Sequence, residues 1–241
     1  MRYTALISNA ADEYINALQK EFSILRIPPD CRLDLPVSSH ADMNIFVLNE
    51  SAVLSCDYIT KYPYIKHYLE NECGVKVILS DGERRKEYPY DIMLNVLVCD
   101  DICFSLEKHT CNEIKELIKL HGFRYKNIRQ GYAACSSLSF GKCIISADAS
   151  VINAAESVGI KCLKISSGGI HLEGYNEGFI GGASGVCENT VYFTGNVKKH
   201  PDGEKILRFI ETEGFNINCL SDGELYDIGG IKFVKNITSQ Q

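Results

Sequence analysis

A short apolar strand that ends in Ser or Thr recurs five times along this sequence. The five segments read ALIS, AVLS, ICFS, CIIS and VYFT, and their hydroxyl residues are Ser8, Ser55, Ser105, Ser146 and Thr194. Successive hydroxyl residues lie 47, 50, 41 and 48 positions apart. Self-similarity at a period of this length is typical of chains built from repeated supersecondary units. The sequence therefore predicts five copies of one structural unit.

The segment that follows each of these strands has helical periodicity and leads into a further strand. The spacing is clearest at 110–120, where Ile114, Leu117 and Ile118 fall on one helical face. Four of the five helical segments meet a glycine, the residue that most easily takes the left-handed backbone that ends a helix. These glycines are Gly74, Gly122, Gly159 and Gly214. Each unit therefore contains a strand, a helix and a second strand.

Another strand precedes most of the repeated strands and is joined to its partner by a tight polar turn, as in SLSF-GK-CIIS. The first unit lacks this leading strand, but the segment LYDIGGIKFV at 225–234 supplies one. We therefore expect an α/β fold, a five-fold pseudosymmetric ββαβ ring, formed by residues 1–241 as one domain. Pairing of the C-terminal strand with the first strand would close the ring and remove exposed sheet edges. The alternative, an open doubly wound sheet, leaves the repeat unexplained.

Composition narrows the classes of function. The chain carries 25 basic and 31 acidic residues without a long block of either sign, which argues against a nucleic-acid surface. No stretch approaches the roughly 18 apolar residues of a membrane span. Acidic residues follow the N-terminus too closely for the apolar stretch of a signal peptide. We expect a cytoplasmic protein that binds a small-molecule substrate or ligand, and neither nucleic acid nor membrane.

The eleven cysteines are scattered and include no CxxC pair. Most of them stand inside apolar runs such as NVLVCDDICF and IKCLKI. In a reducing compartment such residues behave as small buried hydrophobic side chains. We therefore expect free thiols, with no metal site and no cofactor.

Five ββαβ units around a pseudo-fivefold axis resemble the pentein, or β/α-propeller, superfamily. That superfamily includes enzymes that modify guanidino groups: arginine deiminase, agmatine deiminase, amidinotransferases and dimethylarginine dimethylaminohydrolase. It also includes a non-enzymatic branch typified by a ribosome anti-association factor. The segments GFIGGASG and LYDIGGIKFV are similar to a bacterial family of this fold whose function is not known. The resemblance covers the whole chain at the level of architecture.

In the enzymes of this superfamily a cysteine attacks a guanidinium carbon, and a histidine of a His-x-Asp motif handles protons. The resemblance implies that Cys135, at the leading strand of the fourth unit, is the nucleophile. It implies that His40 and Asp42, at the leading strand of the second unit, form the His-x-Asp motif. We expect a loop position to expose the thiol, with Arg129 or His40 beside it. We also expect His40 and Asp42 to share one face of a strand.

Carboxylates grip the guanidinium nitrogens in these enzymes, and Glu177 and Asp227 are the candidates in this sequence. Asp227 precedes Gly229-Gly230, which looks like the superfamily's Gly-Gly segment beside such a carboxylate. The fifth unit departs from the enzymes, because its leading strand, FIGGASG, has no carboxylate where they carry an acidic pair. His171 and Glu173 form a second pair at strand spacing, which replaces His40 if the register differs.

Two functions fit these residues. The first is a cysteine-dependent hydrolase or transferase that acts on a guanidine- or amidine-type C–N bond. The alternative is a non-catalytic protein of the same fold that binds a small molecule or a protein partner. Arg84 and Arg85 could hold a substrate carboxylate, but the neighbouring Glu83 and Glu87 favour an exposed charged loop.

Overall fold

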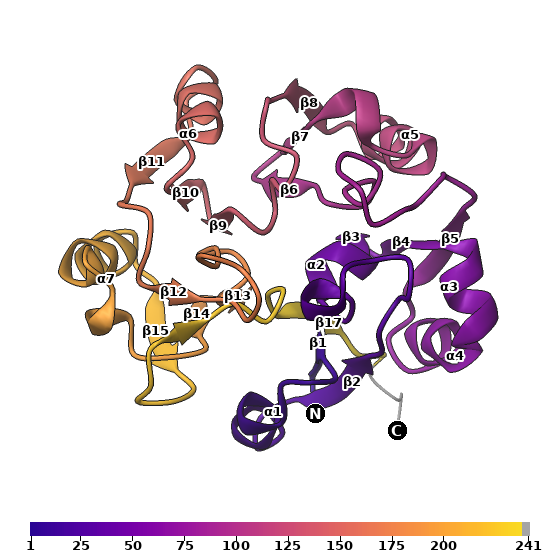
Figure 1. The fold of residues 1–241 in the computed structure, drawn as a ribbon, viewed down its shortest axis with the longest axis horizontal. Coiled ribbons are helices and arrows are strands. Elements are labelled where there is room, and N and C mark those ends of the chain that lie inside the picture. Colours follow the sequence, from indigo (N-terminus) through magenta and orange to yellow (C-terminus); the bar gives the residue numbers. More distant parts are fainter. Residues whose placement is uncertain (238–241) are drawn as a thin grey trace.

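Five three-stranded sheets surround a central axis in the computed structural model, which describes residues 1–237 (Figure 1). In each sheet a middle strand pairs antiparallel with a leading strand and parallel with a third strand. The leading strands lie innermost and the main helices lie at the outside of the ring. The repeat and the order of elements within each unit are therefore confirmed.

Each sheet is given as leading, middle and third strand. They are β17 (Lys232–Lys235), β1 (Tyr3–Ser8) and β2 (Ser23–Ile27); β3 (Phe46–Leu48), β4 (Ser51–Ser55) and β5 (Lys76–Ser80); β6 (Leu97–Cys99), β7 (Ile102–Ser105) and β8 (Arg124–Asn127); β9 (Ser137–Phe140), β10 (Cys143–Ser146) and β11 (Lys161–Lys164); and β13 (Ser184–Cys187), β14 (Thr190–Phe193) and β15 (Asn216–Cys219).

A helical segment connects the middle and third strands of every sheet. These segments are α1 (Asp12–Leu18), α3 (Cys56–Lys61) with α4 (Pro63–Asn71), α5 (Asn112–Leu120), α6 (Ala149–Glu156) and α7 (Gly203–Thr212). All four glycines predicted to end helices have positive φ angles, between 65° and 82°. One prediction needs correction, because the continuous helix expected after β4 is divided into α3 and α4. Pro63 begins α4, and its ring prevents the preceding helix from continuing unbroken.

The C-terminal strand closes the ring as expected. β17 pairs antiparallel with β1, from Tyr3 opposite Lys235 to Leu6 opposite Lys232. At this junction the backbone N–H of Asn236 donates to the carbonyl of Arg2, and Figure 1 shows β17 beside β1. Every leading strand therefore pairs with a middle strand on its outer side. The other edge of each leading strand faces the axis of the ring.

A sixth, two-stranded sheet was not expected from the sequence. β12 (Ile170–His171) pairs in parallel with β16 (Leu225–Tyr226). The pairing ties the long segment between β11 and β13 to the segment that leads into β17. Together with the 3₁₀ turns Leu35–Val37, Glu107–His109 and Val197–Lys199, these short elements lie in the connections of the ring.

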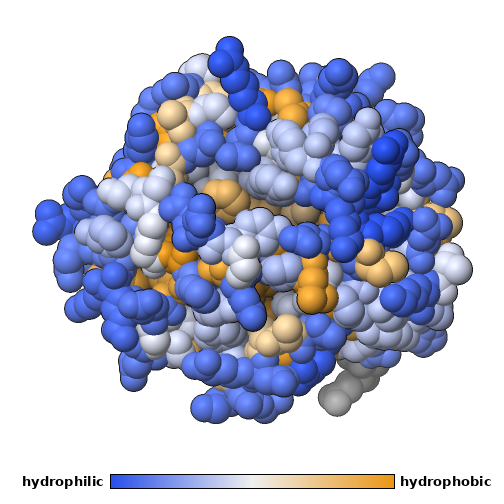
Figure 2. All heavy atoms as spheres, in the orientation of Figure 1, coloured by the Kyte–Doolittle hydropathy of each residue, from blue (hydrophilic) through white to orange (hydrophobic). Residues whose placement is uncertain are grey.

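Apolar side chains fill the spaces between the sheets and their outer helices. One cluster packs Ile114, Leu117 and Ile118 of α5 against Phe46 and Val53 of the neighbouring sheet, so the helical face predicted from spacing is the buried face. Hydrophilic side chains cover most of the molecular face in Figure 2, and hydrophobic ones show between them. Within residues 1–237 no helix has the length and apolar character needed to cross a membrane.

Candidate active site

The chain segments that lead into the inner strands converge on one cavity of 160 Å³. His40 stands directly before the short helix α2 (Ala41–Asn44), Cys135 two residues before β9, and Asp227 directly after β16. All three line the cavity, together with Glu177 from the segment after β12. Residues from four of the five units thus meet near the axis, as the repeat predicts for loops at equivalent positions.

Aromatic rings form much of the cavity wall. Tyr132 and Phe179 are stacked, with ring centroids 6.4 Å apart and an interplanar angle of 30°. The hydroxyl of Tyr132 donates to Asp91 at 2.6 Å, and the hydroxyl of Tyr175 donates to Asp34 at 3.0 Å. These hydrogen bonds hold two of the three rings in place. The cavity therefore combines flat apolar walls with a few charged groups, a combination typical of sites for small ligands.

Asp227 is the most firmly held of the charged groups. Its Oδ1 accepts from the backbone N–H of Gly229 at 2.9 Å, and its Oδ2 accepts from that of Phe179 at 2.8 Å. Nδ1 of His40 lies 3.7 Å from Oδ1. Burial raises the pKa of Asp227 to about 6, and the nearby Asp42 acts in the same direction, while His40 and the two N–H groups oppose the shift. The carboxyl group therefore titrates close to neutral pH.

The prediction that His40 and Asp42 share one face of a strand is wrong. They do not alternate along a strand, because His40 precedes the four-residue helix α2, which contains Asp42. The helical turn directs the two side chains into different surroundings: His40 lines the cavity with Asp227, whereas Asp42 lies against the inner strands. Gly229 permits this packing, since a Cβ at that position would lie 2.1 Å from the His40 Cβ.

The prediction that the Cys135 thiol is exposed is also wrong, because the residue is only 5% exposed. Its sulfur accepts a hydrogen bond from Nδ2 of Asn95 at 2.9 Å and lies 3.9 Å from the sulfur of Met43. Burial raises the pKa of the thiol well above its usual value, and the negative charges of Asp42 and Asp227 raise it further. In the free protein the group is therefore a neutral thiol held at the cavity wall.

Two buried polar residues that support the site were missed. Asn95 reaches Cys135 and also accepts from the backbone N–H of Ala134 at 2.8 Å, so it fixes the turn that carries the thiol. Arg84 has a fully buried side chain, pairs with Asp30 at 3.1 Å and donates to the carbonyl of Met43 in α2. The interpretation of Arg84 as part of an exposed charged loop is wrong. Only the neighbouring Arg85 is exposed.

The remaining candidates lie around the cavity to different degrees. Glu177 lines it, and Glu173 lines an adjoining cavity of 260 Å³ that shares His40 and Asp227. His171 is exposed and packs its ring against Tyr226, with centroids 4.8 Å apart. Arg129 is exposed and is not among the residues that line the cavity of Cys135. The structure thus brings His40, rather than His171, to the wall shared with Cys135.

A model of a protein family, described as a family of unknown function (DUF6873), matches residues 6–232. The match spans nearly all of the ring, from the first strand to the closing strand. The chain belongs to the DUF6873 family. Among curated proteins, no match to the sequence is found.

Solved structures place the fold of this DUF6873 protein. A mutant of dimethylarginine dimethylaminohydrolase from Pseudomonas aeruginosa, complexed with citrulline, superposes with a TM-score of 0.56 and 11% identity, covering 97% of this chain and 98% of that one. An amidinotransferase of saxitoxin biosynthesis from Microseira wollei gives 0.55 and 11%, covering 91% and 88%. Inosamine-phosphate amidinotransferase from Streptomyces griseus gives 0.54 and 11%, covering 96% and 81%. The fold is that of the pentein superfamily.

Within residues 1–237 of this DUF6873 protein, no group of three or more His, Cys, Asp and Glu side chains is arranged so that it could hold a metal ion. A buried thiol, an imidazole and a carboxyl group with a pKa near neutrality share one aromatic cavity. Such a set can bind a planar cation, move a proton and offer a sulfur nucleophile.

Proposed function

We propose that this protein is a cysteine-dependent hydrolase or transferase that acts on a guanidine- or amidine-type C–N bond of a small cationic molecule. The observation that carries the proposal is the convergence of Cys135, His40 and Asp227 on one cavity walled by aromatic rings. A planar cation fits such a cavity, because it stacks on aromatic faces and pairs with a carboxylate through parallel hydrogen bonds.

The charges around the cavity define the substrate class more closely. The cavity adjoins two others, of 260 and 190 Å³, with which it shares lining residues. Glu13, Glu173, Glu177 and Asp227 are among the residues that line the three cavities, whereas none of the described lining residues is Lys or Arg. A substrate carboxylate would find no cationic partner there. The favoured substrate is therefore a guanidine or amidine without a carboxylate group.

A bound cation supplies what the thiol lacks in the free protein. The negative charges of Asp42 and Asp227 help to raise the pKa of Cys135, so a cation bound beside Asp227 in the cavity lowers it. The thiolate sulfur then bonds to the central carbon of the substrate, and the C–N bond to the leaving amine breaks as that nitrogen takes up the thiol's proton through His40. Water, or a second amine, attacks the thiouronium carbon, and the C–S bond breaks to restore the thiol.

The alternative is non-catalytic binding of the same cation. It is favoured by the setting of Cys135, which packs with Leu33 and Met43 and whose thiol has a raised pKa. Under this alternative the carboxylates and rings bind the ligand, and the sulfur is part of the wall. Binding of benzamidine to wild type and to Cys135→Ser, without any amidinium-directed modification of the thiol, is the result that this alternative predicts.

Two alkylating agents of similar size test the proposal. Chloroacetamidine carries a planar cation and chloroacetamide is neutral, and both lose chloride as the thiolate forms a C–S bond. The exposed thiols of Cys31 and Cys219 serve as internal standards in peptide mass mapping. We expect chloroacetamide to modify Cys135 more slowly than either standard. Chloroacetamidine should instead modify Cys135 about tenfold faster than it modifies the standards, which is roughly the effect of one charge-assisted hydrogen bond.

Asp227→Asn should abolish the amidinium preference at Cys135. Asp222→Asn is the matched control, because it makes the same change of charge at an exposed residue that is not among those lining the cavity. Equal rates for the two reagents at Cys135, relative to the standards, would show that the cavity does not recognise the cation. An unchanged preference in Asp227→Asn would likewise refute the assigned role of this carboxylate.

A further inference from the structure

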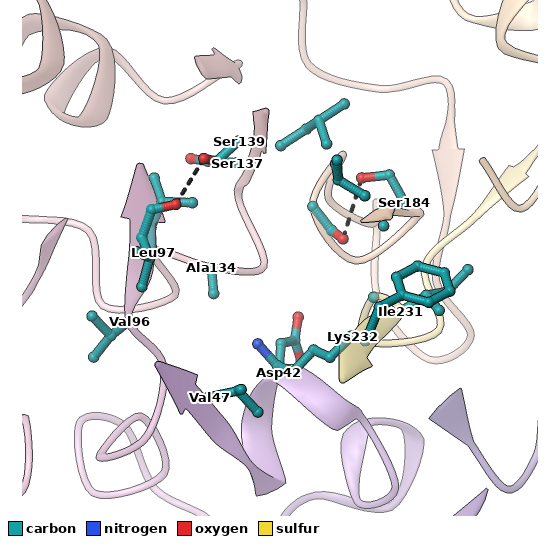
Figure 3. A pocket seen from close by; sticks show the side chains of 18 residues that line it. Asp42, Val47, Val96, Leu97, Ala134, Ser137, Ser139, Ser184, Ile231 and Lys232 are labelled. Carbon is teal, nitrogen blue, oxygen red and sulfur yellow. Dashed lines mark hydrogen bonds between the residues drawn. The ribbon is translucent and has the colours of Figure 1, made fainter. Parts of the chain in front are cut away.

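The five leading strands enclose a further pocket of 260 Å³, which we call the axial pocket (Figure 3). Strands β3, β6, β9, β13 and β17 all contribute to its wall. Several of its lining residues come shortly after residues of the candidate active site in the chain: Val47 follows Met43, Ser137 follows Cys135, and Lys232 follows Asp227. The axial pocket therefore lies behind the active-site cavity, further along the same axis.

Two opposite charges in the axial pocket lack partners. Asp42 is 3% exposed, and neither of its carboxylate oxygens has a hydrogen-bond partner among residues 1–237. Lys232 extends across the pocket toward Asp42 in Figure 3, yet no hydrogen bond or ion pair joins its ammonium to a residue within 1–237. Burial lowers the pKa of Lys232, and the charge of Asp42 opposes this shift. A buried carboxylate without partners is costly, so an absent partner is the natural explanation.

The hydroxyl side chains of the axial pocket already have hydrogen-bond partners. The hydroxyls of Ser139 and Ser184 donate to backbone carbonyls, each at 2.7 Å, and that of Ser137 donates to Ser146 at 3.2 Å. Apolar side chains, including those of Val47, Val186 and Phe233, line most of the remainder. The pocket thus offers one cation, one anion and an apolar surface.

We propose that the axial pocket binds a small zwitterion, an α-amino acid with an aliphatic side chain, whose carboxylate contacts Lys232 and whose ammonium contacts Asp42. A ligand with one charge would leave either Lys232 or Asp42 unpaired. A phosphate would be repelled by Asp42, and a sugar would find few free hydrogen-bonding side chains. The aliphatic side chain would pack against the valines of the inner strands.

This site communicates with the candidate active site through Asp42. The charge of Asp42 helps to raise the pKa of the Cys135 thiol. An ammonium group bound at Asp42 offsets that charge, so it eases deprotonation of the thiol. The zwitterion therefore activates Cys135 from behind, and a cation in the active-site cavity acts on the same sulfur from the front. Only this activation rests on the proposed function; the binding itself does not.

Calorimetric titration of three related probes tests the proposal. L-leucine carries both charges, L-leucinamide lacks the carboxylate, and 4-methylpentanoate lacks the ammonium. We expect leucine to bind at least about tenfold more tightly than either analogue, since each loses a charge-assisted hydrogen bond. Binding should persist in Cys135→Ser, which has no nucleophile. Failure of the proposed enzyme activity would therefore leave this result intact.

Variants of the closing strand locate the ligand. Lys232→Met should weaken leucine binding by about tenfold or more, whereas Lys235→Met is the matched control, because Lys235 is an exposed residue of the same strand. Val47→Phe fills the pocket without touching its charges and should also prevent binding. Circular dichroism and thermal unfolding establish that each variant is folded.

Equal affinities for Lys232→Met and Lys235→Met, or no saturable binding of leucine to wild type, would overturn the proposal. Loss of leucine binding in Asp227→Asn would also overturn it, because the ligand would then occupy the active-site cavity.

Discussion

The carboxylate of Asp227 occupies the space that a side chain on Gly182 would need. A Cβ on Gly182 would lie 1.9 Å from Oδ1 of Asp227, and the backbone N–H groups of Ile228 and Gly230 both donate to the Gly182 carbonyl. The segment that leads into β13 therefore passes directly against the segment before β17. This contact leaves no room for a side chain at position 182, so the segment FIGGASG cannot carry a carboxylate there.

Gly229 should be intolerant of a side chain because of its contact with His40. It has a φ of 77°, and an added Cβ would also lie 2.4 Å from the His40 Cα. Gly214→Ala is the matched control, since Gly214 has a φ of 81° with nothing within 4 Å. We expect the control to lose about 1 kcal/mol for its backbone strain, and Gly229→Ala to lose roughly 2 kcal/mol more through the clash. Urea unfolding of both variants measures the difference, and equal losses would contradict the packing described.

Binding of a cationic ligand should strengthen as pH rises through about 6, the pKa of Asp227. Below that pH the carboxyl group is protonated and offers the cation no charge. Benzamidine titrations between about pH 5 and about pH 8 should show the affinity rising and then levelling off once the carboxyl group is fully ionised. Asp227→Asn should remove the step, and a step that remains in this variant must come from another group.

The same pKa shift predicts how Asp227 affects stability. Because its pKa is raised in the fold, the folded protein binds the proton more tightly than the unfolded chain does. Asp227 therefore favours folding most below its ordinary pKa, about 4, and this contribution is lost as pH rises toward about 6. Denaturation midpoints measured across this window should fall less steeply with rising pH in Asp227→Asn than in wild type.

Loss of Arg84 should destabilise the protein, because its side chain is fully buried and paired with Asp30. Removing one member of a buried ion pair costs about 3 kcal/mol, and we expect Arg84→Met to lose this much in urea unfolding. Arg85→Met is the neighbouring control, since its ion pair with Glu83 is exposed and should contribute less than about 1 kcal/mol. Similar midpoints for the two single variants would contradict a structural role for Arg84.

The fold could be predicted because its signals are local. Strands that end in a hydroxyl residue, helical spacing as in 110–120, and stops such as Gly159 each depend on a few neighbouring residues. Closure followed from one missing strand and one surplus strand. The short pairing of β12 with β16 involves two residues in each strand, so it leaves no periodicity to detect.

The site was predicted less completely because its details depend on distant contacts. His40, Cys135 and Asp227 were selected by resemblance and by place in the repeat, and they do meet in one cavity. The four residues of α2 are too few to show helical spacing, so the relation between His40 and Asp42 was misjudged. The burial of Arg84 could not be predicted, since its partner Asp30 lies 54 positions away. Its neighbours in sequence are charged, so it was interpreted as part of an exposed loop.

The strand that closes the ring is also the strand that carries Lys232. Among the strands of residues 1–237, β17 pairs with β1 alone, and the chain passes round the whole ring between these two strands. Local opening of this junction would admit water and solutes to the axis, and an amino acid joining Lys232 to Asp42 would fasten it to the second unit. Binding of an amino acid in the axial pocket should therefore slow amide hydrogen exchange along β17. The exchange rate at this junction would then show whether the pocket is occupied.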